Sequence, residues 1–429
     1  MPSRIPSSND PVLPGRELWG TERFWHFAHH EHQGAFDMVS IFVVDVGSRH
    51  LSIEDWRKAW SKLYRTFAVL SQKISDDSGE GKIVDGALRA EESFFTGPIL
   101  QDDQDRIDYS LQQRRFDCLS LTVFATSGTE HESFHLAISN PHALGDAKGI
   151  FAIGKALIQG VLSQTQAELQ SPTSPPPQPS LKAFTTSHNQ DLGLKAMFEV
   201  ARTGSSIGFP ILPKETSAEL EPASREWRRV FTFSPAQTET LVQLCKAKAL
   251  TVSAWLQATI LHALIDTLVD DKGDEKAEQT FTVAAMPFHS PLSVSGATST
   301  IFAPISIRVG SKAELNDIAE AVAESFGLAR RFAEDVQDDY VKTLLKLFGS
   351  VRLETSVPTF SSLGRLDTVT GLKRYHVVAR NNLPTTGIHA WTLNDQLNLT
   401  LSWAPARFRR DHIEKFWSTW IGTIKEVVA

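Results

Sequence analysis

Apolar and polar positions follow two different periods along this chain of 429 residues. Residues 36–46, FDMVSIFVVDV, are almost continuously apolar and rich in branched side chains, which predicts a buried strand. Residues 118–126 and 133–139 predict two further strands, joined through a polar segment. The stretch after the first strand instead carries apolar side chains at helical spacing, at Ile53, Trp56, Trp60, Leu63 and Phe67. A strand followed by a helix is therefore the opening unit.

The second half of the chain repeats this alternation. Residues 225–234 predict a strand, and the residues from there to 268 predict two helices. Thr251 is a candidate N-cap of the second helix, whose apolar stripe consists of Val252, Leu256, Ile260, Leu264 and Leu268. Three further strands are predicted at 281–286, 303–309 and 397–403. A helix is predicted at 409–428, at the end of the chain.

A proline-rich stretch divides the chain. Residues 171–180, SPTSPPPQPS, are half proline, which neither a helix nor a central strand tolerates, so we expect a stiff extended connector there. We therefore predict an N-terminal lobe over 1–170, a linker and crossover over 171–225, and a C-terminal lobe over 226–429. Because strands and helices alternate in both halves, the expected fold class is α/β with two similar lobes, each a mixed sheet with packed helices.

Composition narrows the function. The formal net charge is −7 without a basic stripe, which argues against nucleic acid and against an anionic membrane as main partners. The two cysteines, Cys118 and Cys245, lie far apart in apolar segments, so neither a disulfide nor a thiolate metal site is expected. We find no apolar leader and no run long enough for a membrane helix, and we expect a cytoplasmic protein with a small-molecule substrate.

The segment SNPHALGDAKGI, residues 139–150, is the main candidate for chemistry. It places His142 and Asp146 four positions apart, between the strand at 133–139 and a helix. At the end of a buried strand, His142 is well placed to act as a general base, although an ordinary turn histidine would fit the same pattern. Asp146 stands where the helix begins and suits a helix cap with or without a catalytic role. Gly149 would allow the helix to approach its neighbour closely.

Other motifs are weaker. The segment HFAHHEHQG offers His26, His29, His30 and His32, but no carboxylate or cysteine is clearly paired with them, and we predict no metal site. Residues 77–86 resemble a phosphate-binding loop, but Asp76 and Ile83 stand where glycine and a hydroxyl residue belong. The sequence has no G-x-S-x-G elbow. A base without a nucleophile of its own indicates direct group transfer.

The order of these segments resembles the chloramphenicol acetyltransferase-like superfamily, which includes condensation domains of peptide synthetases, plant BAHD acyltransferases and fungal trichothecene-type acetyltransferases. NPHALGDAKG matches the H-x-x-x-D-x-x-G signature through His142, Asp146 and Gly149. Residues 241–264 are similar to the helix that opens the second lobe, and FSSLGRLD at 360–367 resembles the family's SNxG turn. Pro141 and Ala147 depart from the condensation-domain pattern and the plant DFGWG sequence is not found. The pattern is therefore closest to the fungal O-acetyltransferases.

The resemblance implies an interlobe tunnel in which His142 is the general base and Asp146 holds the loop. It also implies that Ser361 or Ser362 donates to the oxyanion, unless both are ordinary turn residues. By similarity to plant members, Lys246 and Lys248 would contact coenzyme A phosphates, against the alternative of solvated lysines at a helix end. The partner that orients Asp146 is open, and Arg308 is one candidate.

The function we expect is an acyl-CoA-dependent O-acyltransferase, with acetyl as the expected group and a hydroxyl of an apolar secondary metabolite as acceptor. Acetyl-CoA or another acyl-CoA would be a cosubstrate, and no cofactor would be bound permanently. One alternative takes the acyl group from an acyl carrier protein and releases a polyketide. Another is a family member that cyclises or only binds its ligand. The resemblance favours a monomer.

Overall fold

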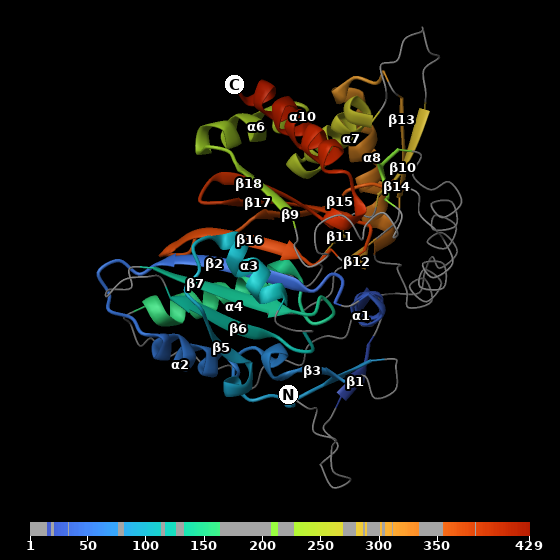
Figure 1. Ribbon diagram of the computed structural model, residues 1–429. Helices are drawn as coiled ribbons and strands as arrows, with labels where there is room; N and C mark the ends of the chain where they lie inside the picture. The colour runs from blue at the N-terminus through green and yellow to red at the C-terminus, as the bar shows by residue number, and fades with distance from the viewer. Residues whose placement is uncertain are drawn as a thin grey trace.

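The computed structural model describes residues 15–18, 21–32, 34–75, 81–112, 116–125, 133–163, 207–212, 227–268, 280–285, 288–289, 301–302, 305–310, 312–333, 355–381 and 383–429. These residues form two lobes stacked on each other, each built around one mixed β-sheet (Figure 1). We call the lobe around the five-stranded sheet the first lobe and the lobe around the four-stranded sheet the second lobe. The expected α/β architecture of two lobes with mixed sheets is confirmed.

The first sheet combines antiparallel pairs with one parallel pair. In spatial order its strands are β16 (Leu372–Ala379), β2 (Met38–Asp45), β7 (Ser133–Asn140), β6 (Ser120–Ala125) and β5 (Phe94–Gly97). Only β5 and β6 run parallel. One face packs on α2 (Ile53–Leu63) and α4 (Ala147–Leu162), and the other packs on α3 (Asp103–Gln112). The strands expected at 36–46, 118–126 and 133–139 are confirmed as β2, β6 and β7, and the helix expected after the first of them is confirmed as α2.

The second sheet is also mixed. Its spatial order is β15 (Thr359–Arg365), β17 (Thr386–Leu393), β18 (Gln396–Trp403) and β9 (Trp227–Thr232), with β15 and β17 parallel. Its outer face is covered by helices α6 (Pro235–Ala247), α7 (Val252–Leu268) and α10 (Arg410–Val428). The Thr251 hydroxyl accepts a hydrogen bond from the Ala254 amide at 3.1 Å, so Thr251 caps α7 as predicted.

Smaller elements complete the description. Three short strands, β1 (Gly15–Glu17), β4 (Lys82–Val84) and β3 (Lys73–Ser75), form a sheet in that order. The two-stranded pairs are β10 (Thr280–Ala285) with β13 (Ile305–Gly310), β11 (Phe288–His289) with β12 (Ile301–Phe302), and β14 (Thr355–Ser356) with β8 (Phe209–Pro210). The remaining helices are α1 (Thr21–Glu31) and α8 (Leu315–Ala333). Of the linker and crossover predicted over 171–225, the structure describes 207–212, and the proline-rich connector at 171–180 lies outside the described residues.

The two lobes are interleaved through β16. This strand follows β15 of the second sheet in the chain, yet it pairs with β2 at the edge of the first sheet. The second sheet lies over this edge, and we call the side of the second sheet that faces the first lobe its interlobe face (Figure 1). Trp391 and Leu393 of β17 lie on this face and belong to the first lobe's hydrophobic core. The hydrophobic core of the first lobe therefore extends onto the interlobe face of the second sheet.

Helix α4 approaches the first sheet closely at Gly154. A Cβ atom at this position would lie 2.2 Å from the Phe42 ring, so only glycine fits. The close approach predicted at Gly149, three residues after Asp146, stays a prediction; the Gly149 backbone amide donates to the helix cap. Because the α4 axis is held against β2, the loop before α4 is held as well.

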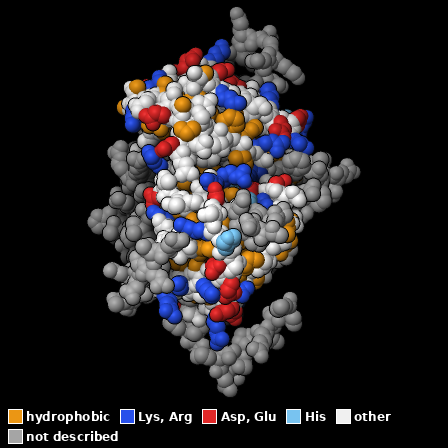
Figure 2. All heavy atoms as spheres, turned by 90° about the vertical axis from the view of Figure 1, so that its left-hand side faces the viewer, with side chains coloured by type: hydrophobic (Ala, Val, Ile, Leu, Met, Phe, Trp, Pro, Cys, Tyr) orange, Lys and Arg blue, Asp and Glu red, His pale blue; other side chains and the backbone are white. Residues whose placement is uncertain are grey.

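In the part of the chain described, no single helix is long and apolar enough to cross a membrane, although the sharply bent pair α6 and α7 passes that test when taken together. Acidic and basic side chains lie interspersed on the face shown in Figure 2, without a continuous stripe of one sign.

Candidate functional site

The loop between β7 and α4 carries the H-x-x-x-D motif and is fixed by a buried asparagine. Asn140 ends β7, and its side-chain amide donates to the carbonyls of Pro141 and Gly145, both at 2.9 Å. The Leu144 amide donates to the Pro141 carbonyl at 3.0 Å and closes a turn around His142. A loop whose carbonyls are held from within presents its histidine in a defined place.

Asp146 is the N-cap of α4. Its Oδ1 accepts a hydrogen bond from the Gly149 amide at 2.8 Å, which satisfies one of the free amides of the first turn. Its Oδ2 makes no hydrogen bond with any described residue, and the side chain of Arg308 lies outside the described residues. The hydroxyl of Tyr375 on β16 donates to the Ala147 carbonyl at 3.3 Å, which ties the start of α4 to the edge strand.

His142 stacks on an aromatic ring from α1. The ring centroids of His142 and Trp25 lie 4.1 Å apart with an interplanar angle of 11°. Burial lowers the pKa of His142 below its ordinary value, opposed by its own backbone carbonyl and by the Asp146 carboxylate. Its Nδ1 makes no hydrogen bond to another described residue. The imidazole is therefore neutral at physiological pH and able to accept a proton.

The two serine candidates face opposite sides of the second sheet. Ser362 lies on the helical side, where its hydroxyl accepts a hydrogen bond from the Ser253 hydroxyl of α7 at 2.8 Å. Ser361 is the register partner of His389 on β17, and Leu363, two residues on, joins the first lobe's core. Ser361 therefore lies on the interlobe face. This placement makes Ser361 the better candidate for an oxyanion donor.

Lys246 and Lys248 lie at the C-terminal end of α6 and are exposed. Helix α6 packs on α10, α7 and β18, on the outer side of the second sheet. The sheet thus stands between these lysines and the interlobe face. Their proposed contact with coenzyme A phosphates stays a prediction.

The histidines of the HFAHHEHQG segment have separate surroundings. His29 Nδ1 lies 2.7 Å from Asp37 Oδ1, and His30 Nδ1 lies 3.0 Å from Glu31 Oε1. His26 packs against the backbone at Gly81. Burial raises the pKa of Asp37, and the His29 ring opposes that rise. Among the residues that the structure describes, no group of three or more His, Cys, Asp or Glu side chains is arranged so that it could hold a metal ion.

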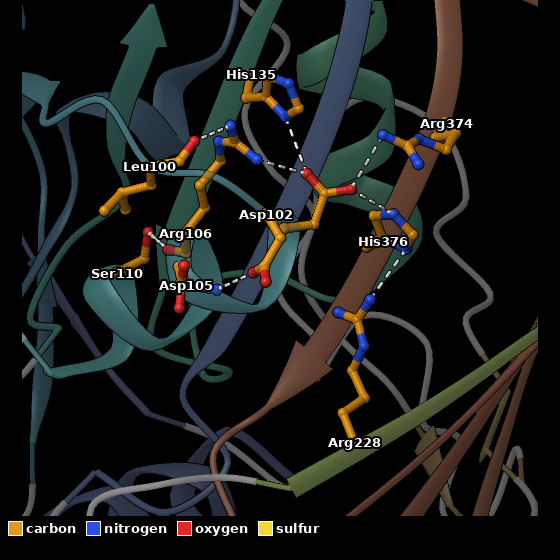
Figure 3. Close-up of polar contacts among 10 residues, drawn as sticks. Leu100, Asp102, Asp105, Arg106, Ser110, His135, Arg228, Arg374 and His376 are labelled. Carbon is orange, nitrogen blue, oxygen red and sulfur yellow. Dashed lines mark hydrogen bonds and ion pairs between the residues drawn. The ribbon is translucent and has the colours of Figure 1, made fainter. Parts of the chain in front are cut away.

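A largely buried polar cluster also joins the lobes, formed by Asp103, Arg106, His135, Arg228 and His376 together with the exposed Arg374. We call it the interlobe cluster (Figure 3). The Asp103 carboxylate lies at its centre, 2.9 Å from His135 Nδ1, 3.2 Å from His376 Nε2 and 3.1 Å from Arg106 Nη1. Arg374 adds a fourth contact at 3.4 Å. Burial alone would raise the pKa of Asp103, but its bonds to His135 and His376 hold that pKa well below its usual range.

His376 links this carboxylate to the second lobe. Arg228 of β9 approaches His376 Nδ1 at 3.3 Å, while the opposite ring nitrogen contacts Asp103. A neutral ring protonated on Nε2 accepts from Arg228 and donates to Asp103 at once. Burial lowers the pKa of His376, which agrees with that neutral form, and lowers the pKa of Arg228 to about 10. The cluster thus holds β9 of the second lobe against β16 and α3.

The two-lobed fold is shared by solved structures of an acetyltransferase and of condensation and epimerization domains. TRI3 trichothecene 15-O-acetyltransferase from Fusarium sporotrichioides superposes with a TM-score of 0.77 at 12% identity, over 100% of this chain and 99% of that one. The condensation domain of the monacolin K polyketide synthase MokA gives a TM-score of 0.65 at 11% identity, over 98% of both chains. The epimerization domain of the third module of tyrocidine synthetase B gives a TM-score of 0.64 at 12% identity, over 98% of this chain and 99% of that one. No protein-family model matches the chain.

Several residues of this region were not singled out from the sequence. Trp25 lies in α1, and its stacking on His142 depends on the tertiary fold. His389 is the one polar residue in the run Ile-His-Ala-Trp at 388–391 of β17, and this polar position was the available signal. The interlobe cluster joins residues as far apart as Asp103 and His376, 273 positions along the chain, and no local pattern reveals it.

Proposed function

We propose that this protein is an acyl-CoA-dependent O-acyltransferase that transfers an acetyl group to a hydroxyl of an apolar secondary metabolite, with His142 as general base. The observation that carries the proposal is the state of His142: a neutral imidazole, stacked on Trp25 in a loop held by Asn140. The fold shared with a trichothecene 15-O-acetyltransferase supports the reaction class.

The chemistry needs little beyond a base and hydrogen-bond donors, because a thioester is already activated. The acceptor hydroxyl gives its proton to His142 while its oxygen attacks the thioester carbonyl, whose electron pair moves to the carbonyl oxygen. The tetrahedral intermediate then collapses, the carbon–sulfur bond breaks, and the leaving thiolate takes the proton from the His142 imidazolium. The products are an ester and the free thiol, and no acyl-enzyme forms.

Asp146 acts on this reaction through the loop. Its carboxylate caps α4 and its charge favours a proton on His142, so it is a positioning residue in this scheme. Ser361, on the interlobe face, is the candidate donor to the oxyanion, and removal of one such donor typically costs about 10²–10³ in kcat. Lys246 and Lys248 would contact the coenzyme's phosphates.

The test is thiol release from acetyl-CoA by the purified protein, with and without a panel of hydroxylated terpenoid and polyketide acceptors. We expect acceptor-dependent thiol release that falls by at least about 10³-fold in His142→Ala, because the base is lost. His50→Ala is the matched control, since His50 is exposed and lies outside this region. Release from an acyl carrier protein but not from acetyl-CoA would favour the carrier-dependent alternative, and ligand binding without release from either donor would favour the non-transferase one.

A further inference from the structure

His389 projects from the second lobe toward the first. Along β17, Ile388 and Ala390 belong to the second lobe's core, whereas Trp391 and Leu393 belong to the core of the first lobe. Since side chains alternate between the two faces of a strand, His389 shares the face of Trp391 and Leu393. That face is the interlobe face.

The same face passes beside the H-x-x-x-D loop. The Trp391 ring lies 5.8 Å from the ring of Tyr375, whose hydroxyl donates to the carbonyl of Ala147, the residue after Asp146. His142 lies close enough to His389 for the two imidazoles to interact electrostatically. Two histidines, one from each lobe, therefore approach each other across the interface.

The His389 ring is buried and neutral. Its side chain is 9% exposed, and its Nδ1 makes no hydrogen bond with any residue that the structure describes. Burial, together with the nearby His142 and Arg228, lowers the pKa of His389 to about 4. A buried polar nitrogen without a partner costs free energy in the absence of ligand, so such a group is a candidate for ligand contact.

A neutral imidazole offers one N–H donor and one acceptor, and a ring with so low a pKa is a poor general base. His142 is the base in the proposed reaction. If His142 takes up a proton during the reaction, its charge disfavours protonation of His389 further, so His389 keeps its neutral form. Neutral histidine is a known electrophilic partner of a carbonyl in other enzymes. The two histidines thus have different roles: His142 accepts a proton as the base, and His389 donates a hydrogen bond.

We propose that His389 is a second catalytic histidine, whose neutral N–H donates a hydrogen bond to the carbonyl oxygen of the bound acyl thioester and to the oxyanion formed from it. This inference rests on the proposed transferase function. Ser361, its register partner on β15, lies beside it on the same face and would supply a second donor. No proton leaves His389 in the cycle: the acceptor's proton goes to His142 and then to the leaving thiolate.

The test compares variants that keep or remove the N–H donor, in the thiol-release assay with acetyl-CoA and an accepted alcohol. His389→Phe and His389→Leu remove the donor, and we expect kcat to fall about 10²–10³-fold with the KM for acetyl-CoA changed less than about threefold. His389→Gln keeps an amide donor, so we expect kcat within about tenfold of wild type. Thr400→Val, at the register partner of His389 on β18, is the control for disturbing this face and should stay within about threefold.

The outcomes separate this inference from the function on which it rests. If His389 had only a structural role, all three His389 variants would lose activity in proportion to the decrease in their urea unfolding midpoints. That result would overturn the inference. Wild-type kcat in a folded His389→Phe or His389→Leu also overturns it, while the transferase function stands. A wild-type protein that releases thiol from no thioester overturns both. The predicted order, with His389→Gln well above the other two at matched stability, supports it.

Discussion

Replacing Asp103 with asparagine removes the charge at the centre of the interlobe cluster while keeping the size of the side chain. The carboxylate contacts His135 at 2.9 Å, Arg106 at 3.1 Å and His376 at 3.2 Å. Asparagine can keep an acceptor oxygen toward His135 and Arg106, but it then turns an NH₂ group toward His376 and Arg374, so two of the four contacts are lost. Hydrogen bonds to charged groups contribute about 1.5–3 kcal/mol each, and removing one partner of a buried ion pair costs about 3–5 kcal/mol. We expect Asp103→Asn to lower the free energy of unfolding by about 3–5 kcal/mol.

The assay is equilibrium unfolding in urea at pH 7, followed by tryptophan fluorescence. Asp102→Asn is the matched control. Asp102 is exposed and its carboxylate accepts from the Asp105 amide at 2.7 Å, a helix-capping role that asparagine fills equally well. We expect that control to change stability by less than about 1 kcal/mol. A loss below about 1 kcal/mol in Asp103→Asn would refute the reasoning, because the carboxylate would then not hold the cluster together.

The pH dependence gives a second check. The pKa of Asp103 is lower in the folded protein than in the unfolded chain, where it is about 3.9. The stabilisation is therefore complete above that unfolded value and is lost as pH falls below it toward the folded-state pKa. The stability difference between wild type and Asp103→Asn should be constant from pH 7 to about pH 5 and should shrink below about pH 4. The same difference at pH 3 as at pH 7 would show that charge is not its source.

Two further predictions concern the placement of the motif loop. Trp25→Leu removes the ring on which His142 stacks, so we expect kcat for thiol release to fall about tenfold or more while Trp25→Phe retains most of it; an unchanged kcat in Trp25→Leu would contradict the positioning role. Gly154→Ala forces a methyl group into the Phe42 ring and should cost about 1–3 kcal/mol in urea unfolding. Gly160→Ala, in open space on the same helix, should instead stabilise by up to about 1 kcal/mol; equal effects at both glycines would contradict the packing argument.

Local patterns predicted the strands and helices that carry the candidate site, because each has a clear period and its own cap. Thr251 illustrates this, since a hydroxyl before an apolar helical stripe led directly to the observed cap of α7. The pairing of strands could not be predicted in this way. Nothing in the sequence of β16 indicates that it pairs with β2. The orientation of His389 toward the first lobe depends on that pairing. The roles of His142 and Asp146 stay predictions that the experiments above test.

Strand β16 follows β15 of the second sheet in the chain but completes the first sheet, and this affects how the chain folds. Ser40 of β2 and Tyr375 of β16 bond to each other across 335 positions of sequence, so the first lobe cannot complete its sheet until the late part of the chain has been synthesised. During translation at about 5–20 residues per second, β2 would wait tens of seconds with one edge unpaired. Such an edge is a template for pairing with another chain. We therefore expect fragments that stop before residue 372 to aggregate on ribosomal release instead of folding as independent first lobes.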